Sequence, residues 1–257
     1  MPLNKSCART IDILELLSHA QEPPTLNQIC EELSLPKSSA FEMLNTLLQK
    51  EAVVYANEQL KSFKLSMKIF RIGTSVLSQT DLYSTAHPLL VRLGKATGET
   101  VYLAVENHGR ITYLDKVENQ QPIRATCVIG SSNYMHVTGL GKALLATYPE
   151  SKVRKIVGGD PLKTFTPQSI ANPEQLMKEL ELVRQRGYAI DDRESMESVH
   201  CIAAPIRDHT GSAVAAISLA ALYSRMTGEY AQSLCGPLLD TALDISHQLG
   251  FAKDRLY

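Results

Sequence analysis

The spacing of apolar residues changes along this chain, and that change limits its fold more than any other feature. Across residues 1–65, apolar side chains recur three and four positions apart, the spacing of a buried helix face. Further on, stretches such as "ETVYLAVENHGRITYLDKV" alternate between apolar and polar residues, which is typical of strands. The pattern predicts a small helical domain followed by a larger α+β domain with an antiparallel sheet.

Three short helices and a hairpin are predicted in residues 1–65. The apolar residues that define the helix faces are Ile13, Leu16, Leu17 and Ala20, then Leu26, Ile29, Cys30 and Leu33, and then Ala40, Met43, Leu44 and Leu47. Thr25 and Gln28 predict a capping box at the second helix, and Pro36 opens the third. "VVY" and "FKL" predict the hairpin. This is the layout of a winged helix-turn-helix, and a small helical bundle fits the pattern about equally well.

Polar residues on the third helix favour the DNA-binding alternative. Lys37, Ser38 and Ser39 are donors beside the positive end of that helix, which suits contact with phosphate. Lys61 and Lys64 add positive charge in the hairpin. The region is nevertheless neutral, with eight basic and eight acidic residues in 1–75, and the whole chain carries a net charge of -1. DNA binding would therefore depend on a local cluster.

Residues 66–81 predict one further helix, and residues 82–257 the larger domain. Ser66 is a candidate cap, and Ile69, Ile72, Gly73 and Val76 form a stripe that we interpret as a linker and dimer seam. The larger domain shows a helix near 82–93, two strands around Asn-His-Gly, three strand candidates in "GYAIDD", "SVHCIAAPI" and "SAVAAISLAAL", the helical "PEQLMKELELVRQRG", and a last helix near 228–249.

Composition narrows the class of protein. The longest apolar runs are far shorter than the roughly 20 residues that span a bilayer, and the N-terminus lacks the apolar region of a signal peptide, so we expect a cytoplasmic protein without a membrane partner. Five scattered cysteines without a C-x-x-C pair argue against disulfides and a zinc ribbon. His136 and His200 have no partners at metal spacing, and we predict no metal and no cofactor.

The segment "HVTGLGKALLATY" resembles part of a phosphate-binding loop. Such a loop needs G-x-x-x-x-G-K-[ST], but His136 stands where the first glycine belongs and Ala143 where the hydroxyl belongs. Nucleotide hydrolysis is therefore excluded. A glycine turn before an apolar helix remains, and its first N–H groups can receive an anion.

Two further residues are candidates for chemistry. Cys201 lies mid-strand and could be a nucleophile, a buried structural thiol or a pocket-lining thiol. Asp191 and Asp192 point to opposite faces of a strand, so at most one of them faces a pocket, and spacing alone favours a solvated turn. We assign no catalytic residue.

The chain as a whole resembles the IclR family of bacterial transcriptional regulators. The resemblance rests on five segments in the right order: "LNQICEELSLPKSSAFEMLNTLLQKEAVV", "FKLSMKIFRIG", "HVTGLGKALLA", "VRQRGYAIDDRES", and "VHCIAAPIRD" followed by "AAISL". It implies a winged helix-turn-helix (1–65), a linker helix (66–81) and a GAF-like effector and oligomerisation domain (82–257) with a central antiparallel sheet flanked by helices. Dimers or tetramers of such chains bind palindromic operators.

The resemblance also implies a pocket for a small organic acid. Carried over to this sequence, its residues are Gly139, Leu140, Asp191, Cys201 and Ser218. Gly139 and Leu140 would offer backbone N–H groups to the acid, and we expect Lys142 at solvent or at an interface. Two departures are Ser198, where relatives commonly have glycine, and Ala220, where some sensors of small oxoacids have serine. The missing hydroxyl at Ala220 disfavours a glyoxylate-like or pyruvate-like ligand. Sugar acids, small hydroxy acids and aromatic acids remain open, and we slightly prefer a sugar acid.

The sequence thus predicts a DNA-binding regulator of a catabolic operon. Thr25 and the three residues that open the third helix would contact the backbone, as would the two hairpin lysines, while Phe41, Glu42 and Asn45 would face base edges. Many relatives carry arginine where this chain has Glu42, which either accepts from cytosine or pairs with another helix. Two alternatives remain: a cysteine-dependent hydrolase of a small acid that uses Cys201, and a ligand-binding module whose first domain binds protein.

Overall fold

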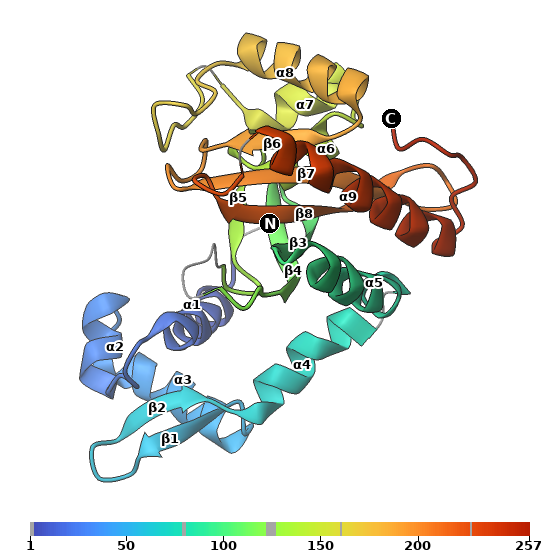
Figure 1. Cartoon of the computed structure of the whole chain (residues 1–257). Helices are drawn as coiled ribbons and strands as arrows, with labels where there is room; N and C mark the ends of the chain where they lie inside the picture. Colours follow the sequence, from blue (N-terminus) through green and yellow to red (C-terminus); the bar gives the residue numbers. More distant parts are fainter. Residues whose placement is uncertain (1–2, 79–80, 122–126, 160, 227) are drawn as a thin grey trace. The chain divides into compact units, whose positions relative to one another are not determined.

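The computed structural model describes residues 3–78, 81–121, 127–159, 161–226 and 228–257, without the side chains of residues 74–81. It divides into two units, Met1–Gln79 and Thr80–Tyr257, each with its own core (Figure 1). Val76, which the sequence placed on the linker stripe, has its side chain outside the described part. In the part that is described, no helix is long and apolar enough to cross a membrane.

The first unit is a three-helix domain with a two-stranded wing. Its elements are α1 (Lys5–His19), α2 (Leu26–Glu32), α3 (Lys37–Gln49), β1 (Val53–Asn57), β2 (Ser62–Leu65) and α4 (Met67–Ser78). Its core contains Ile13, Ile29, Leu44, Val53 and Phe63, all 5% exposed or less. The predicted inward faces are confirmed except at Ala20, which is exposed because it is the C-cap residue of α1.

The turn between α2 and α3 uses an unusual residue. The N–H of Leu35 donates to Cys30 at 2.9 Å and that of Ser34 to Glu31 at 3.3 Å, the bonds of a Schellman motif. Ser34 occupies the left-handed position of the motif with φ of 50°, where glycine is usual. Pro36 then caps α3 rather than lying inside it.

The start of α4 is fixed to the helix-turn-helix. The Ser66 hydroxyl donates to the carbonyl of Glu51 and accepts from the N–H of Lys68 at 3.1 Å, which is the predicted capping role. The Lys68 ammonium donates to the Lys50 carbonyl at 2.6 Å. The first turn of this helix therefore belongs to the body of the first unit.

The second unit is a helix–sheet–helix sandwich. Its elements are α5 (Asp81–Thr97), β3 (Thr100–Asn107), β4 (Arg110–Val117), β5 (Ser132–Tyr134), a 3-10 turn η1 (Met135–Val137), α6 (Gly139–Leu145), α7 (Glu150–Val157), α8 (Pro173–Arg186), β6 (Ala189–Asp192), β7 (Val199–Arg207), β8 (Ala213–Leu222) and α9 (Gly228–Gln248). The strand order is β5-β4-β3-β8-β7-β6 with antiparallel neighbours, so the predicted α+β class is confirmed.

Each face of this sheet is covered by helices (Figure 1). On β3, Leu103 contributes to the core formed with α5 and α9, while Tyr102 contributes to the core formed with α6 and α8. The central strands β3 and β8 therefore lie between two apolar layers, which explains why their sequences are nearly continuous apolar runs. The sequence missed β5 and α7 because both are too short to show a clear period.

Candidate functional site

The outward face of α3 is open to solvent. Ala40, Leu44 and Leu47 are buried against the rest of the first unit, whereas Lys37, Ser38, Glu42 and Asn45 are exposed and Ser39 is half-buried. Phe41 is 57% exposed, which is unusual for an aromatic side chain in a small domain. Positions 37, 41 and 45 lie one turn apart and form a single stripe beside positions 38 and 42. The structure thus brings the predicted base-facing residues together on one surface.

The remaining residues predicted to contact DNA lie at the start of α2 and in the wing. The N–H and the hydroxyl of Thr25 both donate to the Gln28 side-chain oxygen, at 2.8 and 2.9 Å, so a phosphate contact through the hydroxyl would replace the second bond. Lys61 and Lys64 are exposed on the wing, and Lys61 has a left-handed φ of 48°.

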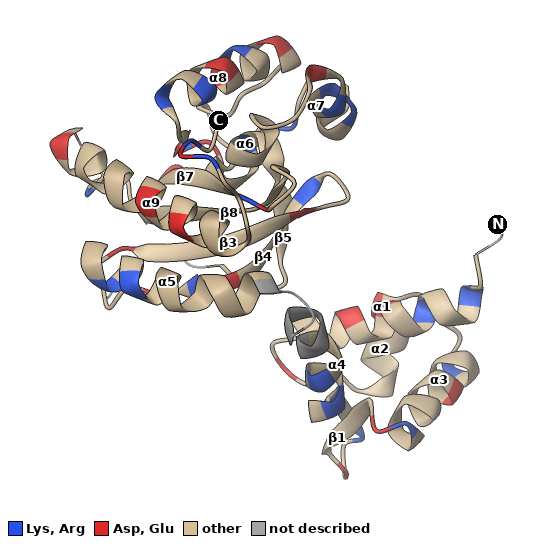
Figure 2. Cartoon of the chain, turned by 90° about the vertical axis from the view of Figure 1, so that its right-hand side faces the viewer, with Lys and Arg blue, Asp and Glu red and all other residues tan. Residues whose placement is uncertain are grey.

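Charge on the first unit is mixed. Figure 2 shows both signs on α1 and on α3, in line with the equal counts in the sequence. Among the ion pairs that the described residues form, none involves Lys37 or Glu42. The charges of α3 therefore face solvent without an ion-pair partner in the described part of this chain.

All five predicted effector residues line one cavity in the second unit, with a volume of about 170 Å³. Gly139 and Leu140 come from α6, Asp191 from β6, Cys201 from β7 and Ser218 from β8. The other lining residues are Tyr102, Tyr113, Cys127, Ser131, Ser132, Asn133, Thr138, Ser195, Met196, Val199 and Ala220. Cavity residues from segments far apart in the sequence thus meet over the α6 side of the sheet.

The position of α6 depends on close backbone contacts. The Thr138 hydroxyl accepts from the N–H of Gly141 at 3.1 Å and caps the helix. A Cβ atom on Gly139 would lie 3.3 Å from Cβ of Ala203 and 3.7 Å from Cβ of Cys201, so the helix begins directly against β7. A Cβ on Gly141 would lie 2.3 Å from the backbone of Met135, so only glycine fits there. The two glycines that suggested a nucleotide loop have a packing role.

Asp191 and Asp192 point to opposite sides of β6, as predicted. Asp191 is 2% exposed, and its carboxylate accepts from the Glu194 N–H at 2.7 Å and from the Ser195 hydroxyl at 2.9 Å. Burial raises the pKa of Asp191. Asp192 is half-exposed, and its pairing with Arg193 lowers its pKa. The solvated turn that spacing alone favoured is therefore correct for Asp192 and wrong for Asp191.

The cavity contains two thiols and two phenols. Burial raises the pKa of Cys201 well above its ordinary value, and the carboxylates of Asp191 and Glu194 raise it further. Burial likewise raises the pKa of Cys127 to about 11. The rings of Tyr102 and Tyr113 meet edge to face at 5.6 Å. Cys201 is thus a pocket-lining thiol, and its raised pKa is the opposite of what activates a nucleophilic thiol.

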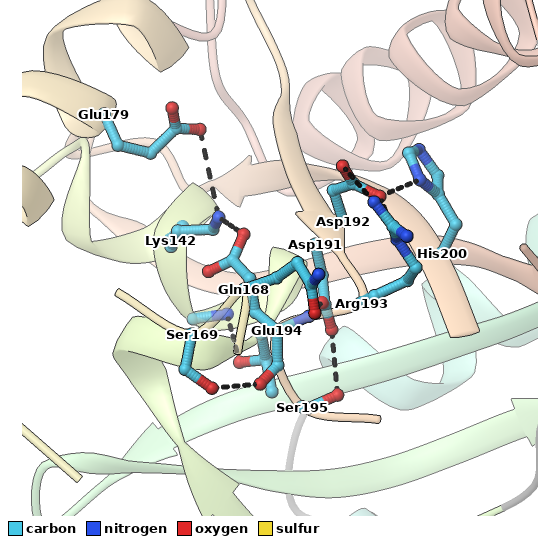
Figure 3. Close-up of polar contacts among 12 residues, drawn as sticks. Lys142, Gln168, Ser169, Glu179, Asp191, Asp192, Arg193, Glu194, Ser195 and His200 are labelled. Carbon is cyan, nitrogen blue, oxygen red and sulfur yellow. Dashed lines mark hydrogen bonds and ion pairs between the residues drawn. The ribbon is translucent and has the colours of Figure 1, made fainter. Parts of the chain in front are cut away.

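Lys142 corrects the expectation of a solvent or interface residue. It is 1% exposed, and its ammonium pairs with the Glu194 carboxylate and lies 3.9 Å from Glu179 (Figure 3). Glu179 in turn pairs with Arg186 at 2.5 Å. Burial raises the pKa of Glu194 to about 7. Sequence could not show this pairing because Glu194 lies 52 positions away.

The described residues contain no group of three or more His, Cys, Asp or Glu side chains placed to hold a metal ion. His136 is buried, and its Nε2 lies 2.8 Å from the Lys163 carbonyl. His200 lies 3.4 Å from Asp192. Both histidines thus have ordinary structural partners.

Comparison with known proteins covers nearly the whole chain. Residues 6–56 match the IclR helix-turn-helix domain, and residues 74–247 match the C-terminal domain of the bacterial transcriptional regulator IclR. The HTH-type transcriptional repressor AllR of Escherichia coli (strain K12) is 34% identical over 242 residues, which span 94% of this chain and 89% of that protein.

Solved structures agree with this result. The Thermotoga maritima IclR structure is similar with a TM-score of 0.83 and 30% identity, over 96% of this chain and 99% of that one. An IclR homologue from Microbacterium hydrocarbonoxydans, solved in complex with 4-hydroxybenzoate, has a TM-score of 0.82 over 95% of this chain and 98% of that one. The second likeness, at 22% identity, concerns the fold alone.

Proposed function

The chain belongs to the IclR family of bacterial transcriptional regulators, and we propose that it is a repressor of a catabolic operon whose operator binding is modulated by a small organic acid. The family consists of regulators and not enzymes, so the hydrolase alternative is set aside. The name of the AllR relative, a repressor, supports the proposed direction of regulation.

One observation carries the proposal: a chain with an exposed helix-turn-helix face also builds a cavity at which residues of α6, β6, β7 and β8 meet. Gly139, Leu140, Asp191, Cys201 and Ser218 converge on that cavity although up to 79 positions separate them, from 139 to 218. A cavity with a few convergent polar groups is the usual form of a small-molecule site.

On the DNA side, we assign roles by chemistry. Lys37, with the hydroxyls of Ser38 and Ser39, would hold α3 on the phosphates, and Lys61 and Lys64 would hold the flanking backbone. Three exposed side chains would read base edges in the major groove. The amide of Asn45 suits adenine, the carboxylate of Glu42 can accept a hydrogen bond from cytosine, and the phenyl ring of Phe41 suits the methyl group of thymine.

On the ligand side, the cavity offers donors at one wall and acceptors at another. The first N–H groups of α6, at Gly139 and Leu140, have no acceptor within the helix and can receive a carboxylate. Asp191 and Ser218 can receive hydroxyl groups. Ala220 removes a hydroxyl that would favour a small oxoacid. We therefore favour a hydroxylated acid of the sugar-acid class over glyoxylate or pyruvate.

Regulation requires that the acid bind one arrangement of the regulator more tightly than another. We propose that two chains form a dimer, or four a tetramer, on a palindromic operator. Two recognition helices would then lie about 34 Å apart or at a multiple of that distance. The acid would shift the equilibrium between arrangements that match this spacing and arrangements that do not.

A thermal-shift screen tests the effector. Gluconate and glycerate represent hydroxylated acids, glyoxylate and pyruvate represent oxoacids, and 4-hydroxybenzoate represents aromatic acids. An acid present at 100 times its dissociation constant stabilises the folded chain by about 2.7 kcal/mol. We expect a shift with a hydroxylated acid. If neither gluconate nor glycerate shifts the transition, the proposed class of hydroxylated acids is wrong.

Operator binding needs a separate test against the remaining alternative, a module that binds protein. Fluorescence anisotropy with DNA from upstream of the chain's own gene, against scrambled DNA of equal length, measures sequence preference. We expect preference for the upstream DNA at moderate salt. Equal and weak binding to both, even at low salt, would favour the protein-binding module.

A further inference from the structure

The buried pair Lys142–Glu194 is not used by either surface described above. Neither side chain lines the cavity, and both residues belong to the second unit, whereas α3 belongs to the first. Lys142 is 1% exposed and Glu194 is 6% exposed. Burying two charges costs free energy that their attraction only partly offsets, and an apolar pair of similar volume is often at least as stable. The pair therefore calls for a role other than stability.

Both partners are attached to walls of the cavity. Lys142 lies on α6, two residues beyond Leu140, which lines the cavity. Glu194 lies in the segment of residues 193–196, which we call the 193–196 loop. Ser195 and Met196 of that loop line the cavity from the other side. Figure 3 shows the contact between the Lys142 ammonium and the Glu194 carboxylate, and this ion pair joins α6 to the 193–196 loop.

The main chain of the 193–196 loop has several other attachments, among them the bond from the Thr166 hydroxyl to the Arg193 carbonyl at 2.7 Å and the bond from the Arg193 N–H to the Val199 carbonyl at 3.1 Å. Asp191 accepts from the Glu194 N–H and from the Ser195 hydroxyl, at 2.7 and 2.9 Å, which ties the loop to the end of β6. The Ser169 hydroxyl donates to the Glu194 carbonyl at 2.6 Å. These bonds hold the main chain of the loop, so the side chain of Glu194 remains as its connection to α6.

One oxygen of the Glu194 carboxylate lacks a hydrogen-bond partner among the described residues. This oxygen, Oε2, is buried. Lys142 also lies 3.9 Å from Glu179, a second carboxylate that pairs with Arg186. A buried network with one unmet acceptor is costly, so the pair is a poor choice for stability alone.

We propose that Lys142 and Glu194 are positioning residues that set how closely the 193–196 loop packs against α6, and thereby control access to the cavity. This inference rests on the proposed function, since it assigns to the pair the closing of the effector site. Neither residue contacts the acid. Loss of the pair would leave the cavity residues in place but let the loop wall separate from α6.

Alkylation of Cys201 by iodoacetamide tests this without an effector. Cys201 lines the cavity and is reached through it, so its rate of modification, followed by mass spectrometry of its peptide, reports loop opening. The variant is the full chain with Lys142→Met and Glu194→Leu, which replaces the ion pair by apolar side chains of similar size. Its folding is verified by circular dichroism and thermal unfolding.

We expect Cys201 and Cys127, which both line the cavity, to react about ten-fold faster in the folded double variant than in the wild type, as local opening of one wall would allow. Acceleration of Cys201 alone would reflect the lost Glu194 carboxylate, which raises the pKa of Cys201 but is not a cause of the raised pKa of Cys127, and it would overturn the proposal. The matched control is Arg225→Met, which removes the ion-pair partner, 2.8 Å away, of Glu99, a buried carboxylate outside the cavity. The control should react at the wild-type rate. A wild-type rate in the double variant, or equal acceleration in the control, overturns the proposal.

A second variant covers a failure of the first to fold. Glu194→Gln keeps the shape of the side chain but removes its charge, and it should accelerate the alkylation of both cavity thiols, Cys201 and Cys127. A wild-type rate in this variant would likewise overturn the proposal. Protection of wild-type Cys201 by gluconate or glycerate forms a separate arm. If neither acid protects, the proposed effector class fails while the acid-free rates still decide the role of the pair.

Discussion

The two surfaces that this chain offers to other molecules are built in opposite ways. On α3, Lys37 and Glu42 face solvent and are absent from the ion pairs that the described residues form. In the cavity wall, the Asp191 carboxylate accepts hydrogen bonds from Glu194 and Ser195, and the Glu194 carboxylate forms an ion pair with the buried Lys142. A substitution on α3 should therefore change DNA binding and leave stability unchanged, whereas a substitution in the cavity wall should change the response to acid and also the stability of the second unit.

The largest effect is expected at Gly141. A Cβ atom there would lie 2.3 Å from the Met135 backbone, so Gly141→Ala must displace α6 or η1. We expect a loss of about 3 kcal/mol or more in the free energy of unfolding, as for overpacked cores. Denaturant unfolding of the full chain measures it.

Gly73→Ala is the control, because Gly73 lies in helix α4 and a Cβ atom there would meet no described atom of a neighbouring side chain or strand within 4 Å. Alanine there should be neutral or stabilising by up to about 1 kcal/mol. Equal destabilisation by both changes would show that α6 tolerates a side chain at 141.

The next effect concerns pH and the buried wall. Because burial raises the pKa of Glu194 to about 7, the folded chain keeps a proton that the unfolded chain releases near its ordinary pKa of 4.5. The contribution of this group to stability is thus full below pH 4.5 and is lost as pH rises through 7. The loss is on the order of 3 kcal/mol.

Glu194→Gln cannot titrate, so its stability should fall less than that of the wild type between pH 5 and 7.5. Subtracting the two pH profiles removes the opposite effect of His136, whose pKa burial lowers. If the free energy of unfolding depends on pH in the same way in both proteins, the assignment of this pH dependence to Glu194 is wrong.

A smaller effect separates roles on α3. Lys37→Ala should weaken binding to every DNA sequence and reduce the slope of log K against log salt by about 1. Glu42→Ala should instead change sequence preference, by about 1–3 kcal/mol at one base pair. Neither should alter the melting temperature appreciably, because both side chains are exposed. Uniform weakening by both substitutions would contradict the division into phosphate and base contacts.

The smallest effect lies in the turn that positions α3. Ser34 has a φ of 50°, a conformation that costs a non-glycine residue about 1–2 kcal/mol. Ser34→Gly should stabilise the first unit by about 0.5 kcal/mol, since the greater entropy of unfolded glycine offsets part of the gain. A thermal transition that falls instead would show that the serine side chain stabilises the turn.

The same contrast explains what the sequence could predict. The spacing of apolar residues predicts the longer helices and strands, because that spacing shows which side of each element is buried. The helices found in this way are α1, α3, α5, α8 and α9. The meeting of Asp191, Cys201 and Ser218 at one cavity followed from the family resemblance, since period says nothing of which buried polar groups meet. The burial of Lys142 was missed because lysine is rarely buried without a partner, and its partner lies in another segment.

We propose above all that one chain joins an operator-binding surface to a separate acid-binding cavity, and Gly139 offers the sharpest test. A valine there would meet Ala203 and Cys201 at the cavity wall, far in sequence from α3. The measurement is operator anisotropy, with and without the acid that gives the largest thermal shift, for the wild type and for Gly139→Val. We expect equal operator affinity without acid and a response to acid in the wild type alone. An unchanged response in the variant, or loss of operator binding together with the response, would contradict the proposal.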